Sequence, residues 1–82
     1  MTLSALIAKR IFRNYKKAVT ANAKDANSMF HVGVCYSVGY GVTKDEKEAL
    51  EWCVNAAKLG SMDALFYLAE TGISPISQFS AK

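Results

Sequence analysis

The sequence predicts an all-α fold, a short solenoid of antiparallel helix pairs with about four helices. Apolar and small residues recur at helical spacing in four successive stretches of the chain. Similar residues also return after 38 positions, from Tyr15 to Cys53, and after 36 positions, from Ala26 to Met62. A period of this size is typical of solenoids, in which each helix pair buries its apolar side against the next.

Length and composition indicate one small domain. The chain has 82 residues, of which 51% are hydrophobic and 21% charged, as is usual for a globular protein. It has no apolar run of about 18 residues that would span a bilayer. A secretory signal is not expected, because the apolar stretch 3–8 is short and the basic residues follow it instead of preceding it.

Charge is unevenly distributed along the chain. Six basic residues precede the first acid, Asp25, and they are Lys9, Arg10, Arg13, Lys16, Lys17 and Lys24. The remainder carries a net charge of −3, which gives the overall +3. A basic, acid-free start is also typical of a mitochondrial transit peptide. These basic residues would also suit contact with phosphates or with an anionic membrane surface.

The first expected helix covers residues 2–22. Its apolar stripe consists of Leu6, Ile11, Tyr15, Ala18 and Val19, with most basic residues outside it. Because Ile11 and Tyr15 return as Ala49 and Cys53, this helix corresponds to the second helix of a repeat. We expect Asn22 to end it in the left-handed conformation, which Asn adopts more readily than most residues.

The second expected helix covers residues 25–38. Asp25 is suited to cap its first turn, where a carboxylate accepts hydrogen bonds from free amides. Gly33 in mid-helix costs about 1 kcal/mol relative to Ala, so we expect it to allow a neighbouring helix to approach closely. Gly39 and Gly41 end the helix in a tight corner, with positive φ expected at one or both.

The third and fourth expected helices cover residues 45–59 and 61–70. Thr43 and Asp45 each begin a capping box, and Gly60 closes the third helix. In the fourth helix, Met62, Ala64, Phe66, Leu68 and Ala69 repeat Ala26, Ser28, Phe30, Val32 and Gly33. The repetition stops at Thr71. Residues 73–82 contain Pro75 and no helical period, so we expect a flexible C-terminal tail after a repeat domain at 1–72.

The central stretch resembles the Sel-one-like repeat family, whose antiparallel helix pairs are related to the tetratricopeptide repeat. The residues that match the family pattern are Gly33, Tyr36, Gly39, Gly41, Val42, Lys44, Asp45, Ala49, Trp52, Ala56, Ala57 and Gly60. The resemblance implies a right-handed solenoid with one full repeat at about 26–60, flanked by two half repeats. It also implies that these residues are structural and that Trp52 serves packing.

The two cysteines are expected to be buried, reduced thiols. In an antiparallel pair about the glycine corner, Cys35 lies opposite Glu48, about 7 to 8 Å along the axis from Cys53. With about 8 to 10 Å between the axes, the two Cα atoms are too far apart for a disulfide. We therefore expect a reducing compartment, the cytoplasm, with mitochondria as the alternative that the basic start suggests.

Sites for chemistry are weakly indicated. The Gly39-x-Gly41 pair has no strand before it and Lys44 where a third glycine belongs, so a phosphate loop is not expected. His31 and Cys35 lie one turn apart, but a metal site needs three or four ligands and a thiol catalyst needs an orienting partner. We expect no enzyme activity, no cofactor and no metal.

The predicted function is that of a non-catalytic protein–protein interaction module, an adaptor or scaffold. In the family, the first helix of each pair lines the concave face, which nominates Asn27, His31, Val34, Val38, Asp63, Tyr67 and Glu70 as the residues that bind a partner. The alternative is an electrostatic binder of RNA or an anionic membrane through the basic first helix. Because each end of the stack leaves apolar surface uncovered, we also expect self-association as a homodimer.

Overall fold

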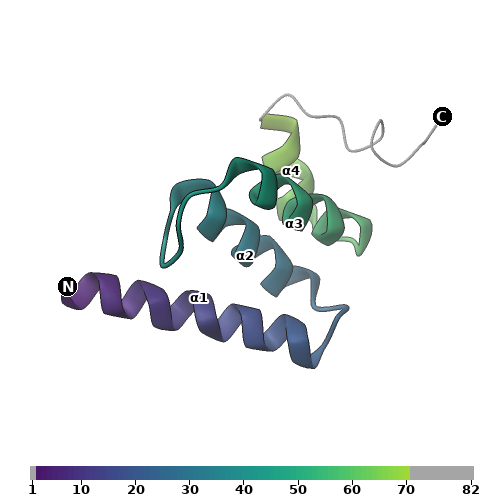
Figure 1. Ribbon diagram of the computed structural model, residues 1–82. Coiled ribbons are helices and arrows are strands. Elements are labelled where there is room, and N and C mark those ends of the chain that lie inside the picture. The colour runs from purple at the N-terminus through teal and green to yellow at the C-terminus, as the bar shows by residue number, and fades with distance from the viewer. Residues whose placement is uncertain (1, 71–82) are drawn as a thin grey trace.

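A computed structural model describes residues 2–70, and these form four α-helices without any strand. The helices are α1 (Leu3–Ala21), α2 (Ala26–Val38), α3 (Glu46–Lys58) and α4 (Met62–Glu70) (Figure 1). The all-α prediction is therefore confirmed, and each expected helix lies within one or two residues of its observed bounds. The expected tail at 73–82 lies outside the described residues.

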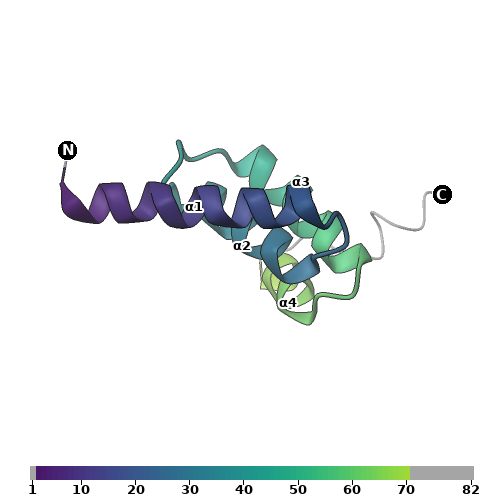
Figure 2. The same cartoon turned by 90° about the horizontal axis from the view of Figure 1, so that it is seen from below.

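The helices stack in chain order as a short solenoid. Each packs against the next, α1 on α2, α2 on α3 and α3 on α4. Helix α2 lies between α1 and α3, and α4 lies on the side of the stack away from α1. The N-terminal end of α1 extends past the other helices (Figure 2). The ends of the stack therefore present α1 on one side and α4 on the other.

Side-chain caps fix where the helices begin. Asp25 caps α2, accepting hydrogen bonds from the Ser28 amide at 3.1 Å and the Ser28 hydroxyl at 2.8 Å. These bonds lower the pKa of the Asp25 carboxyl below its usual value. Asp45 caps α3 by accepting from the amides of Lys47 and Glu48. The sequence predicted Asp25 as a cap and left Thr43 and Asp45 as the two candidates for α3, and the structure selects Asp45.

The end of α1 differs from the prediction. Asn22 does not take the left-handed conformation; its φ of −141° and ψ of 99° are extended. Its side-chain oxygen instead accepts a hydrogen bond from the Lys24 amide at 3.0 Å, and its carbonyl accepts from the Asp25 amide at 3.0 Å. The Asn side chain thus forms a local turn with the following backbone, which removes the need for a positive φ.

The core is built mainly from small side chains between α2, α3 and α4. Val32, Cys53 and Leu68 are its largest fully buried members, and Met29, Ala49, Ala56, Ala57 and Ala64 complete most of it. A Cβ added at Gly33 would lie 2.7 Å from the Cys53 sulfur and 3.1 Å from the Ala49 carbonyl oxygen. Gly33 therefore allows α3 to pack closely on α2, as the sequence predicted.

The glycine corner has two roles. Gly39 and Gly41 have φ values of 76° and 75°, which confirms the positive φ expected there. Gly41 also packs directly on α1, because an added Cβ would overlap the carbonyl of Ala8 and lie 3.0 Å from the Lys9 amide nitrogen. The corner therefore holds α1 against the central helix pair, a contact that the sequence did not predict.

Candidate functional site

The residues nominated on α2 occupy a stripe between α1 and α4. Asn27 and Val38 are exposed, whereas His31 and Val34 are half-buried. On the α1 side, the His31 ring stacks on Tyr15, with 4.6 Å between centroids and 18° between planes. His31 therefore packs on α1 and forms one edge of the stripe. The open part of the stripe consists of Asn27, Val34 and Val38.

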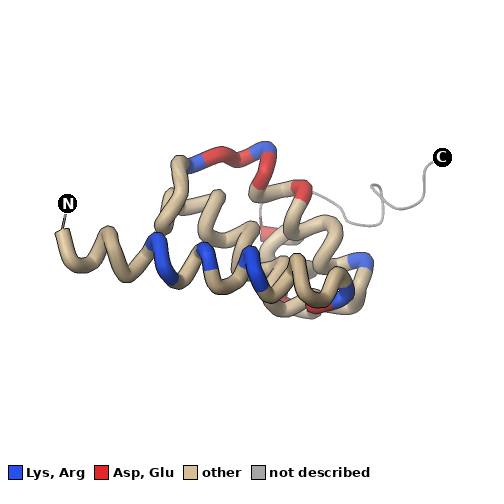
Figure 3. The backbone as a smooth tube through the Cα atoms, turned by 60° about the horizontal axis from the view of Figure 1, so that its bottom comes forward, with Lys and Arg blue, Asp and Glu red and all other residues tan. Residues whose placement is uncertain are grey.

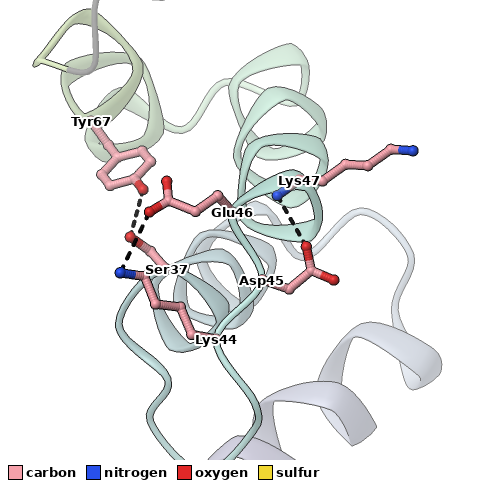
Figure 4. A network of polar contacts seen from close by, with 6 residues as sticks. All are labelled: Ser37, Lys44, Asp45, Glu46, Lys47 and Tyr67. Carbon is pink, nitrogen blue, oxygen red and sulfur yellow. Dashed lines mark hydrogen bonds and ion pairs between the residues drawn. The ribbon is translucent and has the colours of Figure 1, made fainter.

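On the other side of the stripe, Tyr67 joins α4 to α2. Its hydroxyl hydrogen-bonds the Ser37 hydroxyl at 2.7 Å, and its ring meets the Phe30 ring edge-on at 6.4 Å. The Tyr67 side chain reaches across to the C-terminal turn of α2 (Figure 4), beside the Lys44–Glu46 ion pair of 3.6 Å. These contacts set the spacing of α2 and α4 and orient the surface between them.

We call this surface the α2–α4 face, and it comprises Asn27, Val34, Val38, Asp63, Tyr67 and Glu70. Asp63 and Glu70 are exposed, and α2 and α4 together contain no Lys or Arg. The face therefore combines an apolar strip on α2 with two carboxylates on α4. The Tyr15–His31 stack holds α2 against α1, and the Tyr67–Ser37 hydrogen bond joins α4 to α2.

The structure places the two thiols in the core. Both cysteines are buried and free. Burial raises the pKa of the Cys35 thiol and raises that of Cys53 to about 11, so both are protonated near neutral pH. Within residues 2–70, no group of three or more His, Cys, Asp or Glu side chains is arranged to hold a metal ion.

The cations of α1 form an exposed stripe. Lys9, Arg10, Arg13 and Lys17 are exposed, and none of them forms an ion pair with another described residue. Figure 3 shows them in blue along α1, while the acids gather at the start of α3. In that part of the chain that the structure describes, no helix is long and apolar enough to cross a membrane.

The aromatic rings of α1 point into the protein. Phe12 packs edge-on against Tyr36 at 5.5 Å, in addition to the Tyr15–His31 stack. The exposed side of α1 thus offers cations without rings on which bases could stack. Lys16 differs from the other cations, because its ammonium lies 5.2 Å from the Trp52 ring centroid. Sequence reasoning missed this contact, which depends on how α1 is rotated against α3.

The central helix pair has the features of one repeat unit: a close approach at Gly33, a corner with two positive φ values and a helix ended by Gly60 at φ 101°. In a comparison with protein families, the model of the Sel1 repeat matches residues 26–61. Residues 26–61 are therefore similar to a Sel1 repeat. The match covers α2, the corner and α3 in full. No curated protein and no solved structure matches the chain.

Sel1 repeats are generally non-catalytic modules for protein–protein interaction. In this chain the Sel1 motif residues make internal contacts. Tyr36 packs on Phe12, and the Trp52 indole nitrogen donates a hydrogen bond to the Glu48 carboxylate at 3.2 Å. The motif therefore builds the scaffold, and the α2–α4 face and α1 supply exposed side chains.

Proposed function

We propose that the chain is a non-catalytic adaptor or scaffold module that binds a protein or peptide on the α2–α4 face. This proposal rests on the exposure of the Val38 side chain. Its side chain is 65% exposed although it extends the same stripe as the half-buried Val34. An exposed aliphatic side chain on a rigid helix, bordered by polar groups, suits an apolar anchor from a partner.

The charges of the face specify the partner further. Asp63 and Glu70 lie on α4 on either side of Tyr67 in the sequence, and neither α2 nor α4 contains a Lys or Arg. A partner segment with an apolar anchor and a neighbouring Lys or Arg complements this surface. The anchor would pack on Val34 and Val38, and the basic side chain would face the two carboxylates.

The proposal is tested with a displayed library of random peptides selected on the parent chain. We expect the selected peptides to combine an aliphatic or aromatic residue with basic residues. Val38→Asp should weaken their binding by about tenfold or more, because it places a charge where the apolar anchor packs. Leu59→Asp is the matched control, since Leu59 is also exposed but lies at the opposite end of α3 from the corner. Peptides that bind the parent and Val38→Asp equally well would refute this site.

The alternative is an electrostatic binder of RNA or of an anionic membrane through α1. Its support is the unpaired cationic stripe. The two functions differ in their response to salt. A phosphate binder loses affinity steeply between low and moderate ionic strength, whereas a peptide anchored on Val38 depends on salt only through its basic residues. Titrations of RNA and of the selected peptide at two salt concentrations separate them.

A second copy of this chain is one further partner that we propose, on a side of α4 that shares Asp63 and Glu70 with this face but does not include Val38.

A further inference from the structure

Helix α4 presents an apolar side that no described helix covers. Met62 is 61% exposed and Phe66 is 65% exposed, and Ala69 next to them is exposed as well. Met62 and Ala69 stand 36 residues after Ala26 and Gly33. On α2, that side receives α3, since Gly33 touches Ala49 and Cys53. The exposed side of α4 therefore corresponds to the side on which the repeat accepts its second helix.

Helix α1 is a helix of that second type. Ile11, Tyr15 and Ala18 stand 38 residues before Ala49, Cys53 and Ala56, which are three of the four buried residues of α3. The side of α1 that continues from Ile11 toward the N-terminus is open. There Leu3 is 72% exposed and Ile7 is 47% exposed. The chain thus carries, at opposite ends of its stack, a first-type helix and a second-type helix that each have one open apolar side (Figure 1).

The charges beside the two apolar sides are opposite. On α4, Asp63 and Glu70 lie three residues before and four residues after Phe66, so they share its side of the helix. On α1, Arg10 and Lys17 follow Leu3 at intervals of seven, on the same side as Leu3. Helix α1 contains no acid and α4 no base. Contact between α1 and α4 of two copies would pair these charges, whereas α1–α1 and α4–α4 contacts would oppose like charges.

We propose that α1 of one copy docks on the Met62–Phe66–Ala69 side of α4 in a second copy, forming a helix pair between molecules. In this arrangement α1 of each copy contacts α4 of the other, so the two contacts together form an isologous interface. Two such contacts, one in each direction, close a dimer. The inference names a partner for the interaction function proposed above, but its apolar contacts involve neither Val34 nor Val38.

The test combines two charge-reversed variants. The α1 variant carries Arg10→Glu and Lys17→Glu, and the α4 variant carries Asp63→Lys and Glu70→Lys. By sedimentation equilibrium over a micromolar concentration series, the parent chain is expected at twice the 8.9 kDa of one chain. Each variant alone opposes like charges at both contacts, so its association should weaken by about tenfold or more. An equimolar mixture restores opposite charges at both contacts and should recover the mass of the pair.

All four positions are exposed, so circular dichroism at 222 nm should show unchanged helix content in both variants. Glu51→Lys, on an exposed position of α3 outside the contact, is the control and should sediment as the parent does. A parent chain that stays at 8.9 kDa, or a mixture that fails to recover the pair, overturns the proposal. The α1 variant retains the α2–α4 face, so its binding of a selected peptide tests the proposed function separately.

Discussion

The packing of the glycine corner on α1 leads to a quantitative prediction for Gly41→Ala. Two costs add at this position. The φ of 75° is unfavourable for any residue with a Cβ, by about 1 to 2 kcal/mol. The new Cβ would also overlap the carbonyl of Ala8, so the corner must move away from α1, and overpacking of this kind costs about 1 to 3 kcal/mol. We therefore expect a loss of about 2 to 5 kcal/mol.

Two other glycines separate these costs. Gly60 has a φ of 101° and no atom within 4 Å of an added Cβ, so Gly60→Ala should cost only the backbone term of about 1 to 2 kcal/mol. Gly39→Ala should behave similarly, because its nearest neighbour, the Lys44 Cβ, lies at an ordinary 3.4 Å. The excess for Gly41→Ala over these two controls measures the contact between the corner and α1.

The assay is urea unfolding, followed by circular dichroism at 222 nm and by Trp52 fluorescence. A domain of this length has a free energy of unfolding of about 4 to 12 kcal/mol, so the expected loss is a large fraction of it. The midpoints of the three variants give the differences if the slopes agree. If Gly41→Ala lost no more than Gly60→Ala, within about 0.5 kcal/mol, the corner would not be packed on Ala8 and our reasoning would be wrong.

Three further predictions concern the core and the contact between α2 and α4. Gly33→Ala should destabilise the fold by about 1 to 3 kcal/mol despite the better helix propensity of Ala, because the new Cβ meets the Cys53 sulfur at 2.7 Å. Adding Cys53→Ala should recover part of that loss in a double-mutant cycle, and simple additivity would contradict the contact. The Cys53 thiol should react slowly with a thiol reagent until the chain unfolds. Burial raises the pKa of the Cys53 thiol from 9.0 to about 11, so the unfolded chain loses this proton at lower pH than the folded one. The free energy of unfolding should therefore be retained below pH 9 and should fall as the pH rises toward 11. Thermal melts across this range measure the effect. Tyr67→Phe should cost about 0.5 to 1.5 kcal/mol through loss of the 2.7 Å hydrogen bond to Ser37, and Ser37→Ala added to it should cost little more.

The sequence by itself determined the helices, their ends and the small residues at their contacts. Asp25 was predicted as a cap, Asp45 as one of two candidate caps, and a positive φ at one or both of Gly39 and Gly41, and the structure has all of these features. These features depend on hydrogen bonds and backbone sterics within about four residues of each position, so the local sequence contains the information. Gly33 was predicted because its cost inside a helix needs a compensating close contact.

Only the tertiary structure decided which side of each helix meets which neighbour. In the structure, His31 stacks on Tyr15, the Lys16 ammonium lies near the Trp52 ring, and Gly41 packs on the backbone of Ala8. The structure also gave Asn22 an extended conformation where the left-handed one was expected. A helical pattern defines a stripe but not the rotation and offset of one helix against another, because these are set by the packing of side chains far apart in the sequence. For the same reason, the open part of the α2 stripe could be identified only after α1 and α4 were in place.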